Sequence, residues 1–299
     1  MTKKKILILG GAGFLGSHVA DSLIEKSYNV IIYDIKKSEW VNKKCKFYQG
    51  NISNLKKLET LLKKVDIVYN FAGISDLMDA YKNPIKTINL NILVNAKIIE
   101  LCIKNKIDRY IYASSIYALS DNGSFYKCSK QAAENYLIEY NKKEKINYTI
   151  LRFGSLYGPR SNYNNGLYKI IFDFIKNDRL SYFGSSKAIR NYIYVKDAAK
   201  ICVEIIKENY KNKIIQITGK KSIQINQIMK KLSKLLKNKK KIEYKNLNNL
   251  NHYEKNPFTY KLDYGLKCFL KKEQKIDKCI TELYNFIKND MKVKNENQK

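Results

Sequence analysis

Residues 6–16 read ILILGGAGFLG, an apolar run followed by closely spaced glycines. Such a run predicts a strand that is buried on both faces of a parallel sheet. Gly10, Gly13 and Gly16 recur at intervals of three, and helical periodicity follows over Phe14–Lys26. A tight turn needs a positive φ, and a pyrophosphate approaches a backbone closely only where side chains are absent. The stretch therefore predicts a strand–turn–helix unit that binds a dinucleotide at the helix N-terminus.

The next predicted strand, Asn29–Tyr33, is followed by an acid, Asp34. A carboxylate at this point of such a unit hydrogen-bonds the adenosine ribose hydroxyls. Its negative charge repels a 2′-phosphate, so the expected cofactor is NAD rather than NADP. Lys36 and Lys37 follow closely and weaken that preference.

Apolar runs and helical periodicity alternate through the first half of the chain. Further strands are predicted at Lys46–Tyr48, Val65–Phe71, Tyr110–Ala113 and Tyr148–Leu151. Helices are predicted between them at Leu55–Lys63, Ile85–Lys104 and Ser124–Lys142. The alternation predicts a parallel sheet covered on both faces, and right-handed crossovers make it a Rossmann-type doubly wound α/β fold.

The pattern loosens after residue 155. One more strand is predicted at Tyr192–Val195, and helices are predicted at Leu167–Lys176, Lys196–Lys207, Ile225–Leu236 and Lys275–Lys288. We expect an NAD-binding domain over residues 1–155, to which Tyr192–Lys207 returns. Residues 156–290 would form mainly a smaller C-terminal α/β substrate-binding lobe, and residues 291–299 a polar tail that frays.

The composition is that of a basic globular protein. The 299 residues carry a formal net charge of +30, which reflects either codon bias toward Lys, Asn, Ile and Tyr or an anionic partner. Six scattered Cys form no C-x-x-C pair, which predicts reduced, mostly buried thiols and no metal site. Since no apolar stretch reaches the roughly 20 residues that span a bilayer, we expect a cytoplasmic protein without a membrane span.

Tyr126 and Lys130 lie four residues apart in a predicted helix and hence on one face of it. The ammonium group, together with the positive charge of an oxidised nicotinamide, favours the phenolate form of the Tyr. Such a Tyr can take a proton from a substrate hydroxyl while a hydride leaves for the nicotinamide. In a chain with 24 Tyr the spacing alone is weak evidence, so the surrounding segments matter.

Three segments surround this pair. Tyr112-Ala113-Ser114-Ser115 ends a predicted strand, residues 151–159 read LRFGSLYGP, and residues 190–197 read RNYIYVKD. With the glycine run, they resemble in kind and order the segments of the extended short-chain dehydrogenase/reductases, the NAD-dependent epimerase/dehydratase family. The resemblance implies an enzyme that uses NAD to modify a nucleotide-diphosphate sugar.

The resemblance also implies roles for individual residues. The catalytic residues would be Ser115, Tyr126 and Lys130. Tyr126 and Lys130 would also contact the cofactor, as would Gly10, Gly13, Phe14, Leu15, Gly16, Asp34, Asn51, Ile52, Phe71, Ala72, Gly73 and Asn91. The substrate would be held by Ser115, Ser155 and Arg190, with the guanidinium fork of the Arg on the diphosphate.

Several positions depart from the family pattern. Asn51, Ser155 and Asn191 stand where the family commonly has Asp, Asn and Asp. Ile116 and Tyr117 follow Ser115, where dehydratases of the family carry Asp-Glu to expel a hydroxyl and deprotonate C5. Neither replacement can do that work, so 4,6-dehydration is not expected.

Four further residues have expected roles of their own. No second Arg for the diphosphate is evident, and Lys255 or Lys261 could substitute for it. His18, just inside the first helix, is expected to be a packing or cofactor-adjacent residue. Cys128, between Tyr126 and Lys130, is expected to pack against its own helix.

The function favoured by these patterns is that of a nucleotide-sugar epimerase that acts at C4 through a transient 4-keto sugar. A one-way 4-dehydrogenase or 4-keto reductase shares every motif and is the alternative. A non-catalytic NAD-binding protein that holds nucleic acid is a minor one, because no nucleic-acid motif is present. The resemblance implies a homodimer formed through Ile85–Lys104 and Ser124–Lys142.

Overall fold

The centre of the molecule is a single parallel sheet. A computed structural model describes residues 4–237, 240–245, 252–259, 266–268 and 270–296. The sheet has the strand order β14-β11-β6-β5-β4-β1-β2-β3, and all its pairings are parallel. Its strands are β1 (Lys5–Leu9), β2 (Asn29–Asp34), β3 (Lys46–Gln49), β4 (Ile67–Asn70), β5 (Arg109–Ser115), β6 (Tyr148–Phe153), β11 (Lys213–Ile217) and β14 (Leu266–Lys267).

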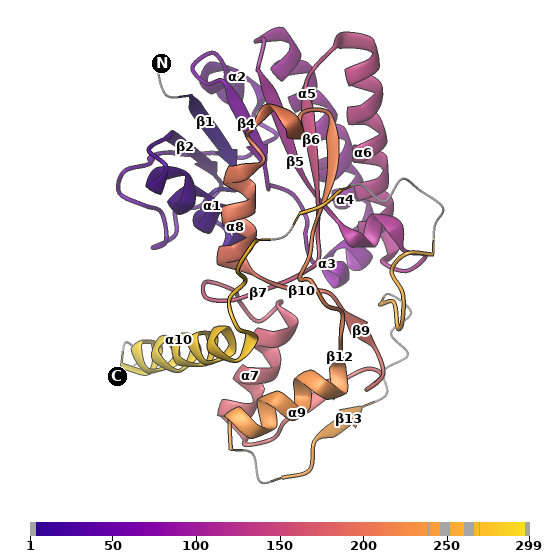
Figure 1. Cartoon of the computed structure of the whole chain (residues 1–299). Helices are drawn as coiled ribbons and strands as arrows, with labels where there is room; N and C mark the ends of the chain where they lie inside the picture. The colour runs from indigo at the N-terminus through magenta and orange to yellow at the C-terminus, as the bar shows by residue number, and fades with distance from the viewer. Residues whose placement is uncertain (1–3, 238–239, 246–251, 260–265, 269, 297–299) are drawn as a thin grey trace.

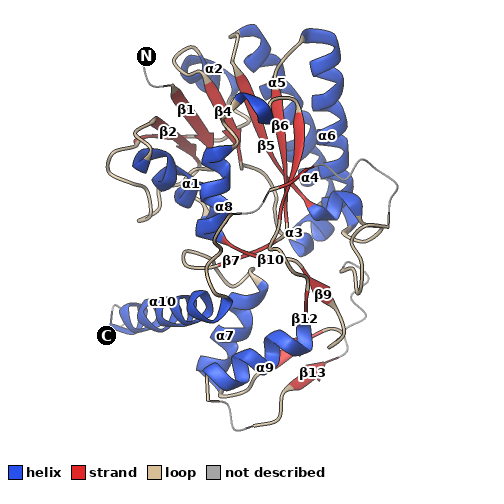
Figure 2. Cartoon of the chain, viewed as in Figure 1, coloured by secondary structure: helices blue, strands red, loops and turns tan. Residues whose placement is uncertain are grey.

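Helices cover both faces of this sheet (Figures 1 and 2). One face is covered by α1 (Phe14–Glu25) and α8 (Val195–Glu204), and the other by α2 (Leu55–Leu62), α5 (Asn95–Lys104) and α6 (Ser124–Glu144). Each face has its own hydrophobic core. The arrangement confirms the predicted Rossmann-type doubly wound fold.

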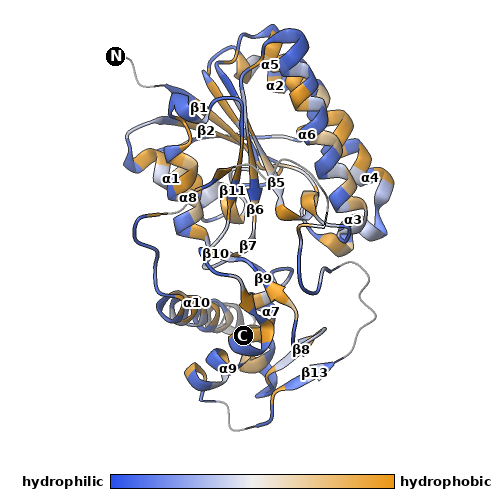
Figure 3. Ribbon diagram, turned by 45° about the vertical axis from the view of Figure 1, so that its right-hand side comes forward, coloured by the Kyte–Doolittle hydropathy of each residue, from blue (hydrophilic) through white to orange (hydrophobic). Residues whose placement is uncertain are grey.

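Strand β1 shows why an unbroken apolar run suits this position. Ile6 and Ile8 belong to the core under α1 and α8, whereas Leu7 and Leu9 belong to the opposite core. Successive side chains of a strand point to opposite faces, so a strand buried on both sides needs apolar residues throughout. Figure 3 shows the complementary pattern on the helices, which carry hydrophobic and hydrophilic residues side by side.

The connection from β4 to α5 differs from the single helix predicted at Ile85–Lys104. It comprises α3 (Leu77–Lys82), α4 (Pro84–Ile88) and a π-helical turn, η1 (Asn89–Val94), before α5 begins. Period-3.6 reasoning cannot find a π-helical turn, and such turns occur frequently at functional sites.

The remaining elements form a smaller lobe around a third hydrophobic core (Figure 1). Its helices are α7 (Gly166–Asn177), α9 (Ile225–Leu235) and α10 (Ile276–Glu296). Its strands pair in twos: β7 (Ser155–Tyr157) with β10 (Tyr192–Tyr194), β8 (Ser181–Phe183) with β13 (Glu243–Lys245), and β9 (Ile189–Arg190) with β12 (Ile223–Gln224).

Two details of the predicted organisation are wrong. The strand at Tyr192–Tyr194 pairs with β7 and not with the large sheet, although α8 does pack on α1. Helix α10 runs to Glu296, past residue 291 where the polar tail was expected to begin; residues 297–299 lie outside the described part. Strand β11, from the range assigned to the lobe, joins the large sheet. The division at residue 155 stays a prediction.

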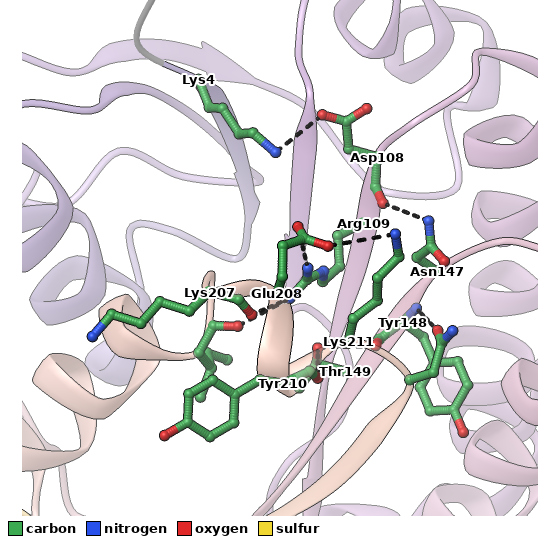
Figure 4. Close-up of polar contacts among 12 residues, drawn as sticks. Lys4, Asp108, Arg109, Asn147, Tyr148, Thr149, Lys207, Glu208, Tyr210 and Lys211 are labelled. Carbon is green, nitrogen blue, oxygen red and sulfur yellow. Dashed lines mark hydrogen bonds and ion pairs between the residues drawn. The ribbon is translucent and has the colours of Figure 1, made fainter. Parts of the chain in front are cut away.

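The amino end of β5 is fastened by Arg109 (Figure 4). This buried guanidinium donates to the carbonyl oxygens of Ile205 and Lys207, at 3.1 Å each, and pairs with Glu208 at 3.0 Å. Glu208 begins the short 3-10 helix η3 (Glu208–Tyr210), which leads into β11. Arg109, one of the few Arg of the chain, therefore stabilises the fold at the amino edge of the sheet. The predicted site lies at the opposite, carboxyl edge.

Candidate active site

The residues predicted to bind the cofactor follow the carboxyl ends of strands β1 to β4. Strands β1 and β4 are neighbours in the sheet although they are not consecutive in sequence. Such a reversal of strand order opens a crevice at the carboxyl edge, which is where doubly wound sheets bind their ligands.

The glycine turn after β1 is as tight as a dinucleotide site requires. Gly10 has φ +76°, and a Cβ there would lie 2.8 Å from the backbone nitrogen of Ala72. A Cβ on Gly16 would lie 2.3 Å from the carbonyl oxygen of Gly10. At Gly13, the N-cap of α1, a Cβ would meet only that same oxygen, at 3.3 Å, so this backbone is open to an approaching group. The N–H groups of Phe14 and Leu15 at the start of α1 then suit a pyrophosphate.

Asp34 lies at the end of β2, beside the glycine turn. Its carboxylate oxygens accept hydrogen bonds from the backbone N–H groups of Ala12, at 2.9 Å, and Ile35, at 2.7 Å. Each oxygen keeps a second lone pair for a ribose hydroxyl. After β3, the Asn51 side chain accepts from the backbone N–H of Ser53 at 2.9 Å, and Ile52 is buried.

The turn after β4 is held by Asn91, which lies in the π-helical turn η1. The Asn91 side chain donates to the carbonyl oxygen of Ile74 and accepts from its N–H, at 2.9 and 2.8 Å. It also donates to the hydroxyl of Ser129 on α6, at 3.0 Å. Gly73 has φ +133°, and a Cβ there would lie 2.5 Å from Asn91 Oδ1. The Phe71–Gly73 turn is thereby fixed against the helix that carries the predicted catalytic Tyr.

The predicted catalytic residues converge at the carboxyl end of β5. Ser115 is the last residue of β5, and its hydroxyl accepts the N–H of Tyr117 in the 3-10 helix η2 (Ile116–Leu119) at 3.2 Å. Lys130 Nζ lies 5.6 Å from the centroid of the Tyr126 ring. It donates to the carbonyl oxygen of Ala113 at 2.8 Å.

Burial shifts the pKa of both members of the predicted catalytic pair. Burial raises the pKa of Tyr126 to about 12, and hydrogen bonding by Ser115 opposes that rise. Burial lowers the pKa of Lys130 to about 8, against the influence of Glu134. The positive charge of an oxidised nicotinamide would lower the pKa of the phenol, so proton removal by Tyr126 depends on a bound cofactor.

A buried ion pair fixes the helix that carries the predicted catalytic residues. Arg152 on β6 bonds Glu134 on α6, with the closest pair of atoms 2.6 Å apart. Ser114, on β5, donates a short hydrogen bond to the same carboxylate. The helix that carries Tyr126 and Lys130 is therefore fixed to two adjacent strands.

The predicted substrate residues lie on the lobe side. Ser155 begins β7, and Arg190 ends β9 and is buried. Arg190 Nη1 donates to the carbonyl oxygens of Ile189 and Tyr253, at 2.8 Å each. Lys255 is exposed, and Lys261 lies outside the described residues.

Sequence reasoning did not select Tyr117, His252 and Tyr253 as site residues. Tyr117 packs edge-on against Tyr126, with ring centroids 6.3 Å apart, and its hydroxyl is 2.7 Å from His252 Nδ1. Tyr253 stacks under Arg190, whose Cζ lies 4.7 Å from its ring centroid. The only sequence signals were the replacement of a dehydratase acid by Tyr117 and the rarity of His.

Two expectations about single residues have opposite outcomes. His18 is buried and hydrogen-bonds the Pro159 carbonyl oxygen at 3.0 Å, as a packing residue would. Cys128 is exposed, so its predicted packing role is wrong, because that side of α6 faces away from the core. The thiols are also less buried than expected: Cys102, Cys202 and Cys279 are buried, and the other three are not.

Within the described ranges, no group of three or more His, Cys, Asp and Glu side chains could hold a metal ion. In the same part of the chain, no helix combines the length and apolar character needed to cross a membrane.

Comparison with known proteins identifies the family. Residues 6–218 match the NAD dependent epimerase/dehydratase family. A Methanocaldococcus jannaschii protein named "Putative UDP-glucose 4-epimerase" is 31% identical over 244 residues, which are 75% of this chain and 79% of that protein. A dTDP-D-glucose 4,6-dehydratase of Dictyostelium discoideum is 31% identical over 231 residues, 65% of this chain and 53% of that protein.

The fold is shared with solved structures. The UDP-glucuronic acid 4-epimerase of Bacillus cereus, crystallised with UDP-glucuronic acid and NAD, superposes with a TM-score of 0.83. The superposition covers 95% of this chain and 99% of that one, at 23% identity.

The chain belongs to the NAD dependent epimerase/dehydratase family. Membership of an NAD-dependent enzyme family confirms the cofactor expected from Asp34 and the glycine turn, and it confirms the family resemblance of the sequence. The tight turn at Gly10 and Gly16, the open backbone at Gly13 and the free lone pairs of Asp34 fit that cofactor.

Proposed function

We propose that the protein is a nucleotide-sugar epimerase that inverts C4 of the sugar through a transient 4-keto sugar. The observation that carries this proposal is the constellation at the end of β5. It combines one phenol, Tyr126, with one hydroxyl, Ser115, and one ammonium, Lys130. Epimerisation at a carbinol needs one proton acceptor that later returns its proton, which this set provides.

Each residue has a defined task in this proposal. Tyr126 accepts the proton of the C4 hydroxyl, and Ser115 hydrogen-bonds the same oxygen. NAD, when bound, would supply the hydride acceptor and donor that C4 needs for inversion. Lys130 holds the nicotinamide ribose, and its ammonium stabilises the phenolate of Tyr126. Ser155 and Arg190 hold the substrate, with Arg190 on the diphosphate.

The proposal excludes 4,6-dehydration. That reaction needs an acid for the departing C6 hydroxyl and a base for the C5 proton. Ile116 is apolar and buried. Tyr117 carries a phenol where the dehydratase base is a carboxylate, and burial raises the pKa of this phenol further. The names of several relatives, such as dTDP-D-glucose 4,6-dehydratase, make this a point for experiment.

The test is a substrate panel with one inactive variant. The NAD-loaded protein is incubated with UDP-, dTDP-, GDP- and CDP-sugars, while absorbance reports reduced nicotinamide and NMR reports the stereochemistry. Tyr126→Phe should lower turnover by about 10²- to 10⁴-fold, as expected for loss of a general acid–base. Tyr28→Phe, directly before the amino end of β2 and so at the sheet edge opposite to the site, is the matched control.

The outcomes separate the candidate functions. A C4 epimer formed without net NADH supports the proposal. Stoichiometric NADH or a released 4-keto sugar would indicate a one-way oxidoreductase. A 4-keto-6-deoxy product would make the enzyme a dehydratase, and absence of turnover with every sugar would favour a non-catalytic NAD-binding protein.

A further inference from the structure

One segment of the lobe side crosses to the predicted catalytic residues. We call residues His252–Thr259 the strap. On the lobe side, the carbonyl oxygen of Glu254 accepts the N–H of Ile189 at 2.7 Å. The carbonyl oxygen of Tyr253 accepts from Arg190 Nη1 at 2.8 Å. Strap and strand β9 are thus joined at two successive residues.

The other end of the strap is bonded to the region that follows Ser115. The N–H of Thr259 donates to the carbonyl oxygen of Leu119 at 3.2 Å, and its hydroxyl accepts the N–H of Asp121 at 2.9 Å. Leu119 ends η2, the 3-10 helix that begins one residue after Ser115. The strap therefore spans from the diphosphate residue Arg190 to the catalytic end of β5.

At the first residue of the strap, the His252 side chain contacts Tyr117, which lies in η2. Tyr117 Oη and His252 Nδ1 are 2.7 Å apart. Burial lowers the pKa of His252 to about 4, and nearby Arg190 acts in the same direction. Burial also keeps the Tyr117 phenol protonated. The contact is therefore a neutral hydrogen bond whose geometry does not change near neutral pH.

The contacts of Arg190 show how the strap orients its guanidinium group. A guanidinium has five N–H donors in a fixed fork. Two of them, on Nη1, are directed to the carbonyl oxygens of Ile189 and Tyr253, and Nη2 is 3.4 Å from the hydroxyl of Tyr182. The Tyr253 ring packs against the flat face of the guanidinium. These contacts orient the fork and leave two donors for a ligand.

We propose that Tyr117 and His252 are positioning residues whose hydrogen bond holds the strap against Arg190 and so sets the affinity for the diphosphate of the substrate. This inference rests on the diphosphate role given to Arg190 under the proposed function. Neither residue moves a proton in the reaction. Loss of their hydrogen bond should weaken substrate binding and leave the chemical step intact.

The test measures binding and turnover separately. Tyr117→Phe removes the hydroxyl and keeps the ring against Tyr126, and His252→Ala removes its partner. Each variant should raise the Kd of UDP or dTDP for the NAD-loaded protein, by calorimetry, about three- to tenfold, the effect of one hydrogen bond. KM for the sugar substrate should rise by the same factor, with kcat within twofold of the wild type.

A double-mutant cycle gives the sharper readout. The combined Tyr117→Phe/His252→Ala variant should bind no more weakly than the worse single variant, because both remove the same bond. His252→Asn offers an amide near the position of Nδ1 and should recover most of the affinity. Tyr28→Phe, directly before the amino end of β2, is the control that should leave Kd, KM and kcat unchanged.

Several results would overturn the inference. A fall in kcat at constant KM would mean that Tyr117 or His252 acts on the reacting sugar. Fully additive Kd changes, or none, would show that their bond does not position Arg190. A wild-type protein that binds neither nucleotide would remove the diphosphate role itself. Nucleotide binding without turnover of any sugar would refute the epimerase and still decide the inference, because Kd does not depend on activity.

Discussion

Burial acts in opposite senses on the two titratable groups of the predicted catalytic pair. A buried phenol resists losing its proton, so the pKa of Tyr126 rises, whereas a buried ammonium resists keeping its proton, so the pKa of Lys130 falls. Both groups are therefore held closer to neutrality than in water. Burial therefore disfavours the charged forms of the two residues that the proposed reaction requires in charged form.

Lys130 should leave a signature in the pH dependence of stability. Its folded pKa of about 8 lies below the ordinary Lys value of 10.5, which the unfolded chain has. Between those two values the unfolded chain binds more protons than the native state, so stability rises with pH. Below pH 8 the penalty of burying the ammonium is fully present. From pH 7 to pH 10 the wild type should gain about 2 kcal/mol relative to Lys130→Met.

Urea denaturation of both proteins at the two pH values measures this difference. Other titrating groups contribute equally to both and cancel. Lys86→Met, at an exposed position of α4, is the matched control. Parallel pH dependences of the wild type and Lys130→Met would show that the ammonium is not buried.

The glycine turn gives a second residue-scale prediction. In Gly16→Ala the new Cβ would meet backbone atoms of Gly10 and Gly11, at 2.3 and 2.8 Å, which no side-chain rotation relieves. We expect a loss of about 1–3 kcal/mol in the free energy of unfolding, as for overpacking, and a protein that no longer retains NAD. Gly166→Ala, whose Cβ would meet nothing within 4 Å, should retain wild-type stability and cofactor. Equal behaviour of the two variants would contradict a turn this tight.

Among the elements, α6 depends on the ion pair between Glu134 and Arg152, in which both side chains are buried. Glu134→Ala should cost about 3–5 kcal/mol of unfolding free energy, because it removes the carboxylate that balances the charge of a buried guanidinium. Glu134→Leu combined with Arg152→Met should recover much of that loss, because apolar residues of similar volume need no charge partner. Guanidinium denaturation monitored by circular dichroism checks both. A single-variant loss below about 1 kcal/mol would instead fit a solvent-exposed pair.

Elements differ in how well the sequence predicts them. The apolar run before Gly10 and the helical spacing of Ser124–Lys142 express local periodicity, and both elements formed where expected. The π-helical turn at Asn89–Val94 could not be predicted, because the Asn91 side chain that fixes it bonds residue 74, outside the helix. Strands of two or three residues, such as β9, arise from tertiary pairing and have no period of their own.

The same distinction applies to the site. Residues at the ends of parallel strands converge on one edge of the sheet, so Asp34 and Ser115 could be selected from the sequence. His252 lies 135 residues from its partner Tyr117, in a segment without a motif. Only the folded chain brings these two together.

On the scale of the whole molecule, α10 ties the lobe to the NAD-binding part. Phe286 on this helix packs against Trp40, which follows β2, with ring centroids 5.4 Å apart. Glu282 accepts a hydrogen bond from Tyr194 at 2.5 Å and pairs with Lys196 at the start of α8. The relative position of the two parts is thus fixed on the side opposite to the strap.

The outer surface of α3, α4, η1 and α6 supports the expected homodimer. These elements contact one another and gather at one side of the molecule (Figure 1). They carry exposed large hydrophobic residues: Met78, Tyr81, Ile85, Ile88, Leu93, Phe125 and Tyr136. Ile85 is 75% exposed. Exposed apolar side chains gathered on neighbouring elements are typical of an interaction site, and the family resemblance implies a dimer formed through Ile85–Lys104 and Ser124–Lys142.

We therefore expect light scattering to give twice the chain mass of 35.0 kDa. Ile88→Lys combined with Leu93→Lys should yield monomers with an unchanged circular dichroism spectrum, because both positions are half exposed and the charges would be buried only in a dimer. Leu235→Lys, at an exposed position of α9, should stay dimeric. A wild type that is monomeric at micromolar concentration would refute the dimer. Because α6 carries both this surface and Tyr126, separation of the subunits would also be expected to loosen the site.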